Sequence, residues 1–372
     1  MSAEIAPKRG RFASVDTFRG AVLGLMLFTP ATGLAGFPWL RHAEWDGLTA
    51  SDWLFPTFLV TSGLSLSFLL RDAPTRAMYW RLVRRLVLLV AVGLVYNAYG
   101  ASWLDLSTLR FTGVLQMIGV AGAGAAVVVL ASRAVLGEEK IWWLLVAATG
   151  IIGLYGLGLD MSCTPAGRCS PYLDVDTGIL GTSHVYRAGQ AGWDPEGIVA
   201  SLAASSLVLY GYAAGVLLRR YGRSNRLQTL ARIGVLAGLC FVGGLAASLW
   251  IPSNKRLLTP AFVLLAAGTA LAVFCVIYLF VDTGKRGPGE PRDWNWPFIA
   301  LGRNALMVFV LERFLLQSAS HVHIGDRSIE ARLLGALPFG ESGVHLAYTA
   351  VLLLVVVGVV GLMHRRRLYL AL

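Results

Sequence analysis

The sequence predicts an all-α membrane protein with about ten transmembrane helices in one bundle. Three observations predict this class: the composition, the length of the apolar blocks and the placement of the basic residues. Of the 372 residues, 56% are hydrophobic and 14% are charged, and the mean hydropathy is +0.64. A soluble domain carries roughly 25% charged residues, so this chain is too apolar to be one. Its apolar blocks hold about 18 to 22 residues, enough to cross a bilayer core of about 30 Å.

Ten apolar segments justify the helix count. Open strands would leave backbone groups unpaired in lipid, and the segments lack the alternation of barrel strands, so we expect helices. The first segment is short and contains Pro30, which favours a tilted or broken helix, and we interpret it as an uncleaved membrane helix. The segments span residues 20–34, 53–70, 82–99, 113–130, 141–159, 197–218, 233–250, 259–281, 297–317 and 344–363.

Lys and Arg alternate between two sets of loops. Of the 32 basic residues, 22 lie at the two ends of the chain and in every second loop, and 8 lie in the remaining loops. Basic loops stay in the cytoplasm, so we expect both termini there and an inner-membrane location. We expect the whole chain, 1–372, to form a single domain. With the termini in the cytoplasm, the loop before residue 53 and the polar region 160–196 would lie outside the cytoplasm. The net charge of +11 therefore orients the chain in the membrane and gives no sign of nucleic-acid binding.

The polar loop 41–52 holds the densest group of reactive side chains, with the sequence RHAEWDGLTASD. His42 is the best candidate for a general base, because an imidazole titrates near neutral pH. It could also accept an acyl group itself. Asp52 can cap the helix that follows. A histidine at the membrane interface without a chemical role is the alternative interpretation.

Two further groups carry charge near or inside the apolar segments. Asp16 and Arg19 lie one helical turn apart and can form a structural pair. Glu312 lies inside the ninth segment, where a charge faces either a cavity or a partner. In region 172–197, acidic side chains beside Trp and Tyr suit a sugar, although residues 194–197 also resemble a helix start.

Four arginines at helix ends on the inner side could bind the phosphates of a donor: Arg84, Arg85, Arg219 and Arg220. Orientation and contact with lipid headgroups explain them equally well. Cys163 and Cys169 share a polar loop and could form a disulfide in an oxidising compartment. We expect no metal site, because neither CxxC nor HxxxH spacing accompanies them.

Taken in order, eight motifs resemble heparan-α-glucosaminide N-acetyltransferase and its bacterial relatives. The order and spacing of the motifs carry the resemblance, which covers nearly the whole chain. They are SVDTFRG (14–20), HAEWDGLT (42–49), DWLFPTFL (52–59), GVLQ (113–116), HVY (184–186), DPEG (194–197), IPSNK (251–255) and GRNAL (302–306).

The resemblance implies a membrane-bound acetyltransferase. The donor would be cytoplasmic acetyl-CoA and the acceptor the amine of an extracytoplasmic amino sugar such as glucosamine. The catalytic histidine of the family corresponds to His42. We further expect Asn304 and Gln116 to donate hydrogen bonds to the developing oxyanion. Candidates for substrate binding are Asp52, Asp174, His184, Asp194, Glu196, Asn254, Lys255 and Glu312.

Two positions depart from the family pattern. Thr29-Pro30 stands where the first helix of the family ends in an Asn that assists the histidine, and Met117 stands where the family has Arg. The sequence leaves two alternatives open: a transporter or flippase of a small or lipid-linked sugar, and an inactive relative. Small-residue spacings such as Gly211 and Gly215 allow close helix contacts, including those of a homodimer.

Overall fold

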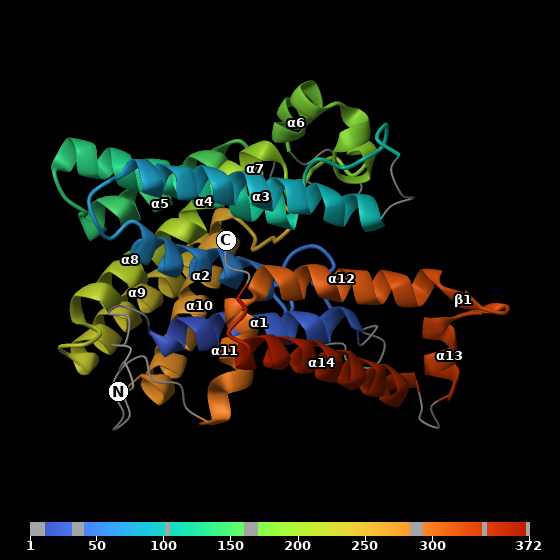
Figure 1. Ribbon diagram of the computed structural model, residues 1–372. Coiled ribbons are helices and arrows are strands. Elements are labelled where there is room, and N and C mark those ends of the chain that lie inside the picture. The colour runs from blue at the N-terminus through green and yellow to red at the C-terminus, as the bar shows by residue number, and fades with distance from the viewer. Residues whose placement is uncertain are drawn as a thin grey trace.

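The computed structural model describes residues 12–31, 41–100, 105–159, 170–282, 293–336 and 341–369. Figure 1 shows the long helices lying side by side along one common direction. Within the described residues the strands form one small antiparallel hairpin, β1 (His323–Ile324) with β2 (Arg327–Ser328).

The first helices in chain order are α1 (Ala13–Ala31), α2 (Leu54–Leu69), α3 (Arg76–Gly100), α4 (Val114–Leu136), α5 (Ile141–Leu157) and α6 (Tyr172–Leu180). Two 3₁₀ turns follow, η2 (Thr182–His184) and η3 (Tyr186–Gly189). The later helices are α7 (Ile198–Ala203), α8 (Ser205–Tyr221), α9 (Arg226–Ala247), α10 (Pro260–Val281), the 3₁₀ turn η4 (Asp293–Asn295), α11 (Trp296–Arg303), α12 (Ala305–His321), α13 (Ile329–Ala336) and α14 (Glu341–Arg365).

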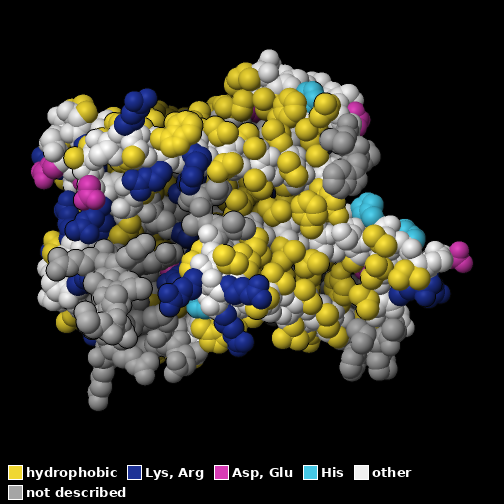
Figure 2. Space-filling model, viewed as in Figure 1, with side chains coloured by type: hydrophobic (Ala, Val, Ile, Leu, Met, Phe, Trp, Pro, Cys, Tyr) yellow, Lys and Arg dark blue, Asp and Glu magenta, His cyan; other side chains and the backbone are white. Residues whose placement is uncertain are grey.

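The prediction of an all-α membrane protein is confirmed. Among the described residues, six helical stretches are long and apolar enough to cross a membrane, namely α3, α4, α7 with α8, α9, α10 and the main part of α14. Helices α2 and α5 are apolar but shorter. Figure 2 shows hydrophobic side chains over much of the visible face, with Lys and Arg gathered towards one end of the long helices. This surface suits a lipid environment.

Two helix boundaries differ from the sequence pattern. The apolar segment begins near residue 20, whereas α1 begins at Ala13, so the helix includes Asp16 and Arg19, which were expected at its start, and it continues through Pro30. Its polar residues do not end the helix, because distant partners satisfy them: Asp16, for example, pairs with Arg303. The ninth segment is not one helix either. It divides at Asn304 into α11 and α12.

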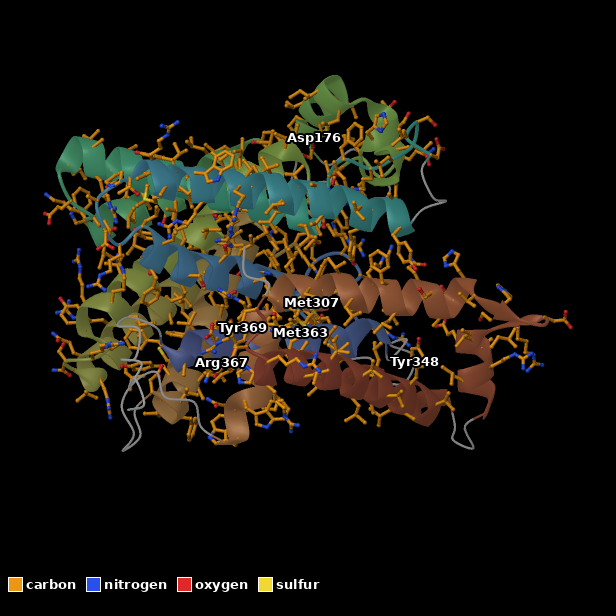
Figure 3. All side chains as sticks on the ribbon, viewed as in Figure 1. Asp176, Met307, Tyr348, Met363, Arg367 and Tyr369 are labelled. Atoms are coloured by element: carbon orange, nitrogen blue, oxygen red, sulfur yellow. The ribbon has the colours of Figure 1, made fainter. Side chains whose placement is uncertain are left out.

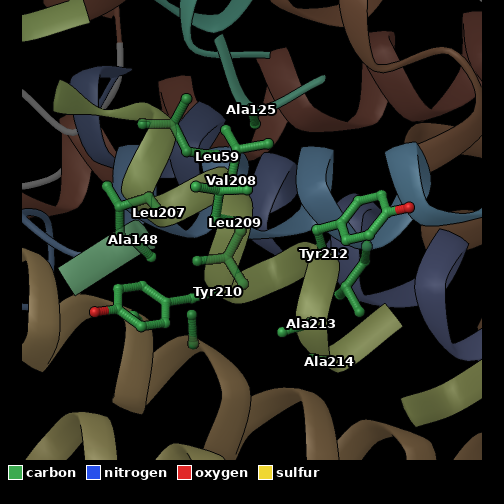
Figure 4. Packing of buried hydrophobic residues seen from close by; sticks show 14 of the residues in the cluster. Leu59, Ala125, Ala148, Leu207, Val208, Leu209, Tyr210, Tyr212, Ala213 and Ala214 are labelled. Carbon is green, nitrogen blue, oxygen red and sulfur yellow. The ribbon is translucent and has the colours of Figure 1, made fainter. Parts of the chain in front are cut away.

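Helices α2 and α8 form the centre of the bundle. Every residue of α8 from Ser205 to Leu218 is buried, and Figure 4 shows this helix surrounded by apolar side chains. A Cβ at Gly211 would collide with the backbone of Val60 in α2. A Cβ at Gly215 would collide with Ser67, also in α2. The two glycines singled out in the sequence therefore pack against a helix of their own chain.

We expect Gly211→Ala to destabilise the protein by about 1–3 kcal/mol, because the added methyl group must displace the backbone of α2. The matched control is Gly238→Ala in α9, where a Cβ would meet nothing within 4 Å. Thermal unfolding in detergent, followed by tryptophan fluorescence, measures both. Equal unfolding temperatures for Gly211→Ala and the wild type would contradict the close contact between α2 and α8.

Candidate functional site

His42 and Asp52 form a hydrogen-bonded pair at the end of the bundle where α2 begins. The distance between His42 Nδ1 and Asp52 Oδ1 is 2.7 Å. The Asp52 side chain is 2% exposed, whereas that of His42 is 53% exposed. The other carboxylate oxygen of Asp52 accepts hydrogen bonds from the backbone N–H groups of Ala43 and Thr49 and from the Thr49 hydroxyl. The loop thus wraps around a buried carboxylate and presents the imidazole at the surface.

The ionisation of Asp52 decides which nitrogen of His42 carries hydrogen. Burial alone would raise the pKa of Asp52, but hydrogen bonds from His42 and Ala43 and the charge of Lys255 outweigh it and hold that pKa well below its usual range. An ionised carboxylate can only accept hydrogen bonds. Nδ1 of His42 is therefore the donor, and Nε2 is left as the basic nitrogen. This arrangement suits a general base or a nucleophile.

Lys255 completes the group from the loop between α9 and α10. Its Nζ lies 3.4 Å from Asp52 Oδ1 and 3.2 Å from His42 Nδ1. Burial lowers the pKa of Lys255, although the neighbouring Asp52 opposes this effect. Asp52 therefore faces two cationic or hydrogen-bonding partners at once, which fixes its position.

The loop that carries Lys255 is tied directly to the loop that carries His42. Asn254 donates its side-chain amide to Asp46 Oδ1 at 3.1 Å. The backbone N–H of Gly47 donates to the carbonyl oxygen of Ser253 at 2.7 Å. Because both contacts join residues about 210 positions apart, the group of His42, Asp52 and Lys255 depends on the whole fold.

A cavity of about 260 Å³, which we call the central cavity, lies among α1, α2, α3, α4, α11 and α12. One part of its wall is polar and carries three arginines, and the rest is mostly apolar. The polar lining comprises Arg19, Thr61, Ser62, Ser65, Arg85 and Arg303. The apolar lining includes Met26, Phe55, Phe58, Leu69, Leu89, Leu115, Ile118, Leu306 and Phe309.

Serine hydroxyls hold two of these arginines. Arg85 donates to Ser62 Oγ at 3.0 Å, and Arg19 contacts Ser65 Oγ. Arg19 also donates to the carbonyl oxygen of Gly302 at 3.4 Å. None of these acceptors carries a charge, so they offset little of the positive charge that the two guanidinium groups bring into the cavity.

The third arginine of the cavity has a charged partner. Arg303 Nε lies 3.0 Å from Asp16 Oδ2, and its Nη1 lies 3.3 Å from the hydroxyl of Tyr369. The guanidinium also stacks over the Tyr369 ring, with 5.2 Å between the guanidinium carbon and the ring centroid. Figure 3 labels Tyr369 near the middle of the long helices. The described lining of the cavity thus has three guanidinium groups, one of them paired with Asp16, an arrangement suited to an anion.

Comparisons with known proteins show which proteins the chain resembles in sequence. No protein-family model matches the chain. Heparan-alpha-glucosaminide N-acetyltransferase of Homo sapiens is 28% identical over 362 residues, which cover 81% of this chain and 52% of that protein. The Mus musculus protein of the same name is 27% identical over 375 residues, or 83% of this chain and 55% of that protein.

The chain is a relative of these N-acetyltransferases. The predicted resemblance is thereby confirmed. The chain spans about half the length of the curated relatives it matches.

Within this relative of the N-acetyltransferases, Asp194 and Glu196 bind the same arginine. Arg110 Nη2 lies 2.7 Å from Asp194 Oδ1 and 2.6 Å from Glu196 Oε2. Asp194 Oδ2 accepts from the Thr112 hydroxyl and from the backbone of Tyr186. Burial alone would lower the pKa of Arg110, but the two carboxylates raise it, whereas burial raises the pKa of Glu196. Both oxygens of Asp194 are therefore engaged in joining the segment 110–112 to the segment 186–196.

His184 is also held by its neighbours. Its ring stacks on Phe111 with 4.2 Å between centroids, and Nδ1 lies 2.7 Å from the carbonyl oxygen of Leu109. Asp174 is an exposed residue of α6. Neither His184 nor Asp174 lines the central cavity. Their predicted roles in binding an acceptor therefore require a site other than the central cavity.

Asp176 is a residue that the sequence pattern did not reveal. It lies on α6, two positions after Asp174, but its side chain is buried and accepts a hydrogen bond of 2.7 Å from the backbone N–H of Ile198. Burial raises its pKa to about 6. Figure 3 labels Asp176 at the end of the bundle that α6 covers. Its partner lies 22 residues away, so the local sequence carries no signal of it.

Three predicted residues lie deep among the helices. Asn304, at the junction of α11 and α12, donates its amide to the carbonyl oxygen of Ala300. Gln116 packs against Gly93, and its buried Nε2 has no hydrogen-bond partner in the described part of the chain. Glu312 is a buried residue of α12. None of the three belongs to the cavity lining.

The four arginines predicted to bind a donor are not in one place. Arg85 lines the central cavity, whereas Arg84 is exposed on α3. Arg219 and Arg220 line a different cavity. The sequence pattern did not reveal Arg19 and Arg303 as companions of Arg85, although charge inside an apolar segment is itself a signal of function.

Two sequence expectations fall where the structure gives no description. The pairing of Cys163 with Cys169 lies outside the described residues. So do the side chains of Thr29 and Pro30. The structure places two side chains against His42: Asp52, which accepts from its Nδ1, and Lys255, whose Nζ lies 3.2 Å from that atom.

Proposed function

We propose that this protein transfers an acetyl group from acetyl-CoA, supplied on the cytoplasmic side, to the amine of an amino sugar on the opposite side of the inner membrane. The observation that carries the proposal is the pair of His42 and Asp52 just before the N-terminus of α2. The same helix also lines the central cavity. The names of the curated relatives supply the reaction class.

Helix α2 connects the two parts of the proposed site. Its cavity-lining residues run from Phe55, three positions after Asp52, to Leu69. At 1.5 Å per residue, this stretch extends for about 21 Å along the helix axis. A long, narrow donor could therefore place its reactive end near His42 and its charged end near the arginines.

The membrane arrangement in this proposal has ten crossings. The six long apolar stretches would be joined by α1, α2, α5 and the α11–α12 pair, with both termini in the cytoplasm. The alternating basic loops support this orientation. In this arrangement the whole chain forms one domain, and His42 and the loop region 160–196 lie outside the cytoplasm.

For the donor, the proposal keeps Arg85 and adds Arg19 and Arg303, because all three line one cavity. Guanidinium groups bind phosphate oxygens through paired hydrogen bonds. The apolar wall formed by residues such as Phe55 and Phe58 would hold the uncharged arm of acetyl-CoA. Acetyl-CoA would enter as a substrate and leave as CoA.

The chemistry then follows from the free nitrogen of His42. The amine nitrogen of the acceptor sugar attacks the thioester carbonyl carbon, and Nε2 of His42 accepts the proton that the amine loses. A C–N bond forms, the C–S bond breaks, and the thiolate of CoA takes the proton from the imidazolium. Asp52 stabilises the imidazolium throughout. Transfer by way of an acetyl group on His42 is a second route to the same product.

The remaining predicted residues keep narrower roles. Gln116 and Asn304 stay predicted oxyanion donors, and the unpartnered amide of Gln116 is consistent with that role. For the acceptor, Asp52 and Lys255 are the predicted residues whose side chains lie beside His42. The extracytoplasmic loops, including Asp174, His184 and the partly exposed Glu196, would bind the sugar.

The experiment that tests the proposal uses purified protein in detergent with labelled acetyl-CoA and a panel of amino sugars. We expect a labelled N-acetyl product and saturable binding of acetyl-CoA. A transporter would bind the sugar without binding acetyl-CoA. Absence of acetyl-CoA binding would therefore contradict the proposal.

We expect Arg85→Gln to raise the KM for acetyl-CoA about tenfold, because one charge-assisted contact to the donor is lost. The value of kcat should change little, because the contact is the same in the ground state and the transition state. The control is Arg81→Gln, an exposed arginine one turn earlier on α3. An unchanged KM for Arg85→Gln would contradict the proposal that acetyl-CoA binds in this cavity.

A further inference from the structure

A second, larger cavity lies at the opposite end of the bundle from His42. Its volume is about 630 Å³, and it shares no lining residue with the central cavity. It is formed where α2, α4 and α8 end, and Arg71 follows the last turn of α2. The lining residues are Phe12, Phe68, Arg71, Arg133, Gly137, Glu138, Glu139, Arg219, Arg220 and Arg223.

The lining contains five arginines and two glutamates. Glu139 is fully engaged: it pairs with Arg133, lies 2.7 Å from Arg219 Nη2, and accepts a hydrogen bond from the Tyr212 hydroxyl. Glu138 is exposed, and its carboxylate lies 3.8 Å from Lys140. Counting the lining residues alone, the cavity therefore has an excess of three positive charges.

Two of these arginines differ from surface residues that only orient a membrane protein. The side chains of Arg133 and Arg219 are 15% and 13% exposed. Arg219 Nε is buried and has no hydrogen-bond partner in the described part of the chain. Burying guanidinium groups is unfavourable unless anions and acceptors compensate. Glu139 compensates only part of this charge.

The other arginines leave donors at the open side of the cavity. Arg220 donates to the backbone carbonyl of Glu139 at 2.9 Å and is otherwise exposed. Arg223 stacks over the Phe12 ring, with 5.6 Å between the guanidinium carbon and the centroid. At Gly137 a Cβ would meet nothing within 4 Å, so the rim is open there.

We propose that this cavity is a binding site for a phosphate ester, separate from the site of acetyl transfer. Guanidinium groups from several elements match the oxygens of a phosphate, and a dianion would offset most of the excess charge. The rings of Phe12 and Phe68, with centroids 6.0 Å apart, give an apolar surface beside the charged group. A lipid headgroup and a soluble nucleotide share this chemistry.

The test compares two arms on the full-length protein. One arm measures binding of ADP in detergent, and the other measures retention of phosphatidylglycerol against phosphatidylcholine by native mass spectrometry. The variant Arg220→Gln with Arg223→Gln should weaken binding in the successful arm at least about tenfold, because it removes two charge-assisted contacts. Both residues are exposed, so the unliganded variant should unfold at the temperature of the wild type.

Two controls make the result specific. Arg81→Gln removes an exposed arginine outside the cavity and should bind as the wild type does. Arg85→Gln alters the central cavity and should also leave this binding unchanged, which separates this inference from the proposed function. Binding in the ADP arm identifies a nucleotide, and binding in the lipid arm identifies a headgroup. Binding in neither arm, or equal binding by the double variant, would overturn the inference.

Discussion

Replacing His42 by alanine should lower the rate of acetyl transfer by about 10²–10⁴-fold, the usual contribution of a general base. The imidazole keeps a basic nitrogen free to meet a substrate, since Nδ1 is taken by Asp52. The unfolding temperature should stay near that of the wild type, because the side chain is 53% exposed. The measurement is turnover of labelled acetyl-CoA with an amino sugar.

A second histidine provides the control for this substitution. His323 in β1 is exposed, and its Nδ1 lies 2.9 Å from the carbonyl oxygen of His321. His323→Ala should retain full activity. Undiminished turnover in His42→Ala would show that another group accepts the proton, and the proposed chemistry would fail.

Asp52→Asn should lower kcat by about 10³–10⁴-fold while leaving the KM for acetyl-CoA nearly unchanged. Asparagine removes the charge that stabilises the imidazolium. It also places an amide NH₂ among donors, because Asp52 accepts from His42, from two backbone N–H groups and from the Thr49 hydroxyl. The protein should also lose about 1–3 kcal/mol of stability, because buried donors lose their acceptor.

Asp52→Glu separates positioning of the imidazole from simple loss of structure. It restores the negative charge at a displaced position, so part of the lost kcat should return. Equal loss of kcat in Asp52→Glu and Asp52→Asn, together with equal loss of stability, would indicate a structural role alone. A higher kcat in Asp52→Glu than in Asp52→Asn would support the role of the Asp52 carboxylate in orienting His42.

The fold could be predicted from sequence because the bilayer imposes a simple rule. Apolar stretches must be helical in lipid, and their length follows from the thickness of the hydrocarbon core. The ends of the helices were harder to predict. The ninth segment divides at Asn304 into α11 and α12. Asp16, expected at the start of the first helix, pairs with Arg303, 287 positions later in the chain. No local pattern could reveal that partner.

The site shows the same division between local and distant contacts. His42 and Asp52 lie 10 positions apart in one loop, so both were found, although the contact between their side chains was not predicted. Lys255 is 213 positions from His42 and entered only through a motif. The cavity that groups Arg19, Arg85 and Arg303 depends on how several helices pack, which a linear pattern does not encode.

The most direct test of transfer across the membrane uses sealed vesicles that contain the purified protein in a known orientation. Labelled acetyl-CoA is placed on the side of the Arg-rich loops, and glucosamine is placed on either the same side or the opposite side. Transfer through His42 predicts labelled N-acetylglucosamine when the two substrates are on opposite sides, and its loss in His42→Ala. Product formed only when both substrates share one side would contradict a reaction that joins the two faces.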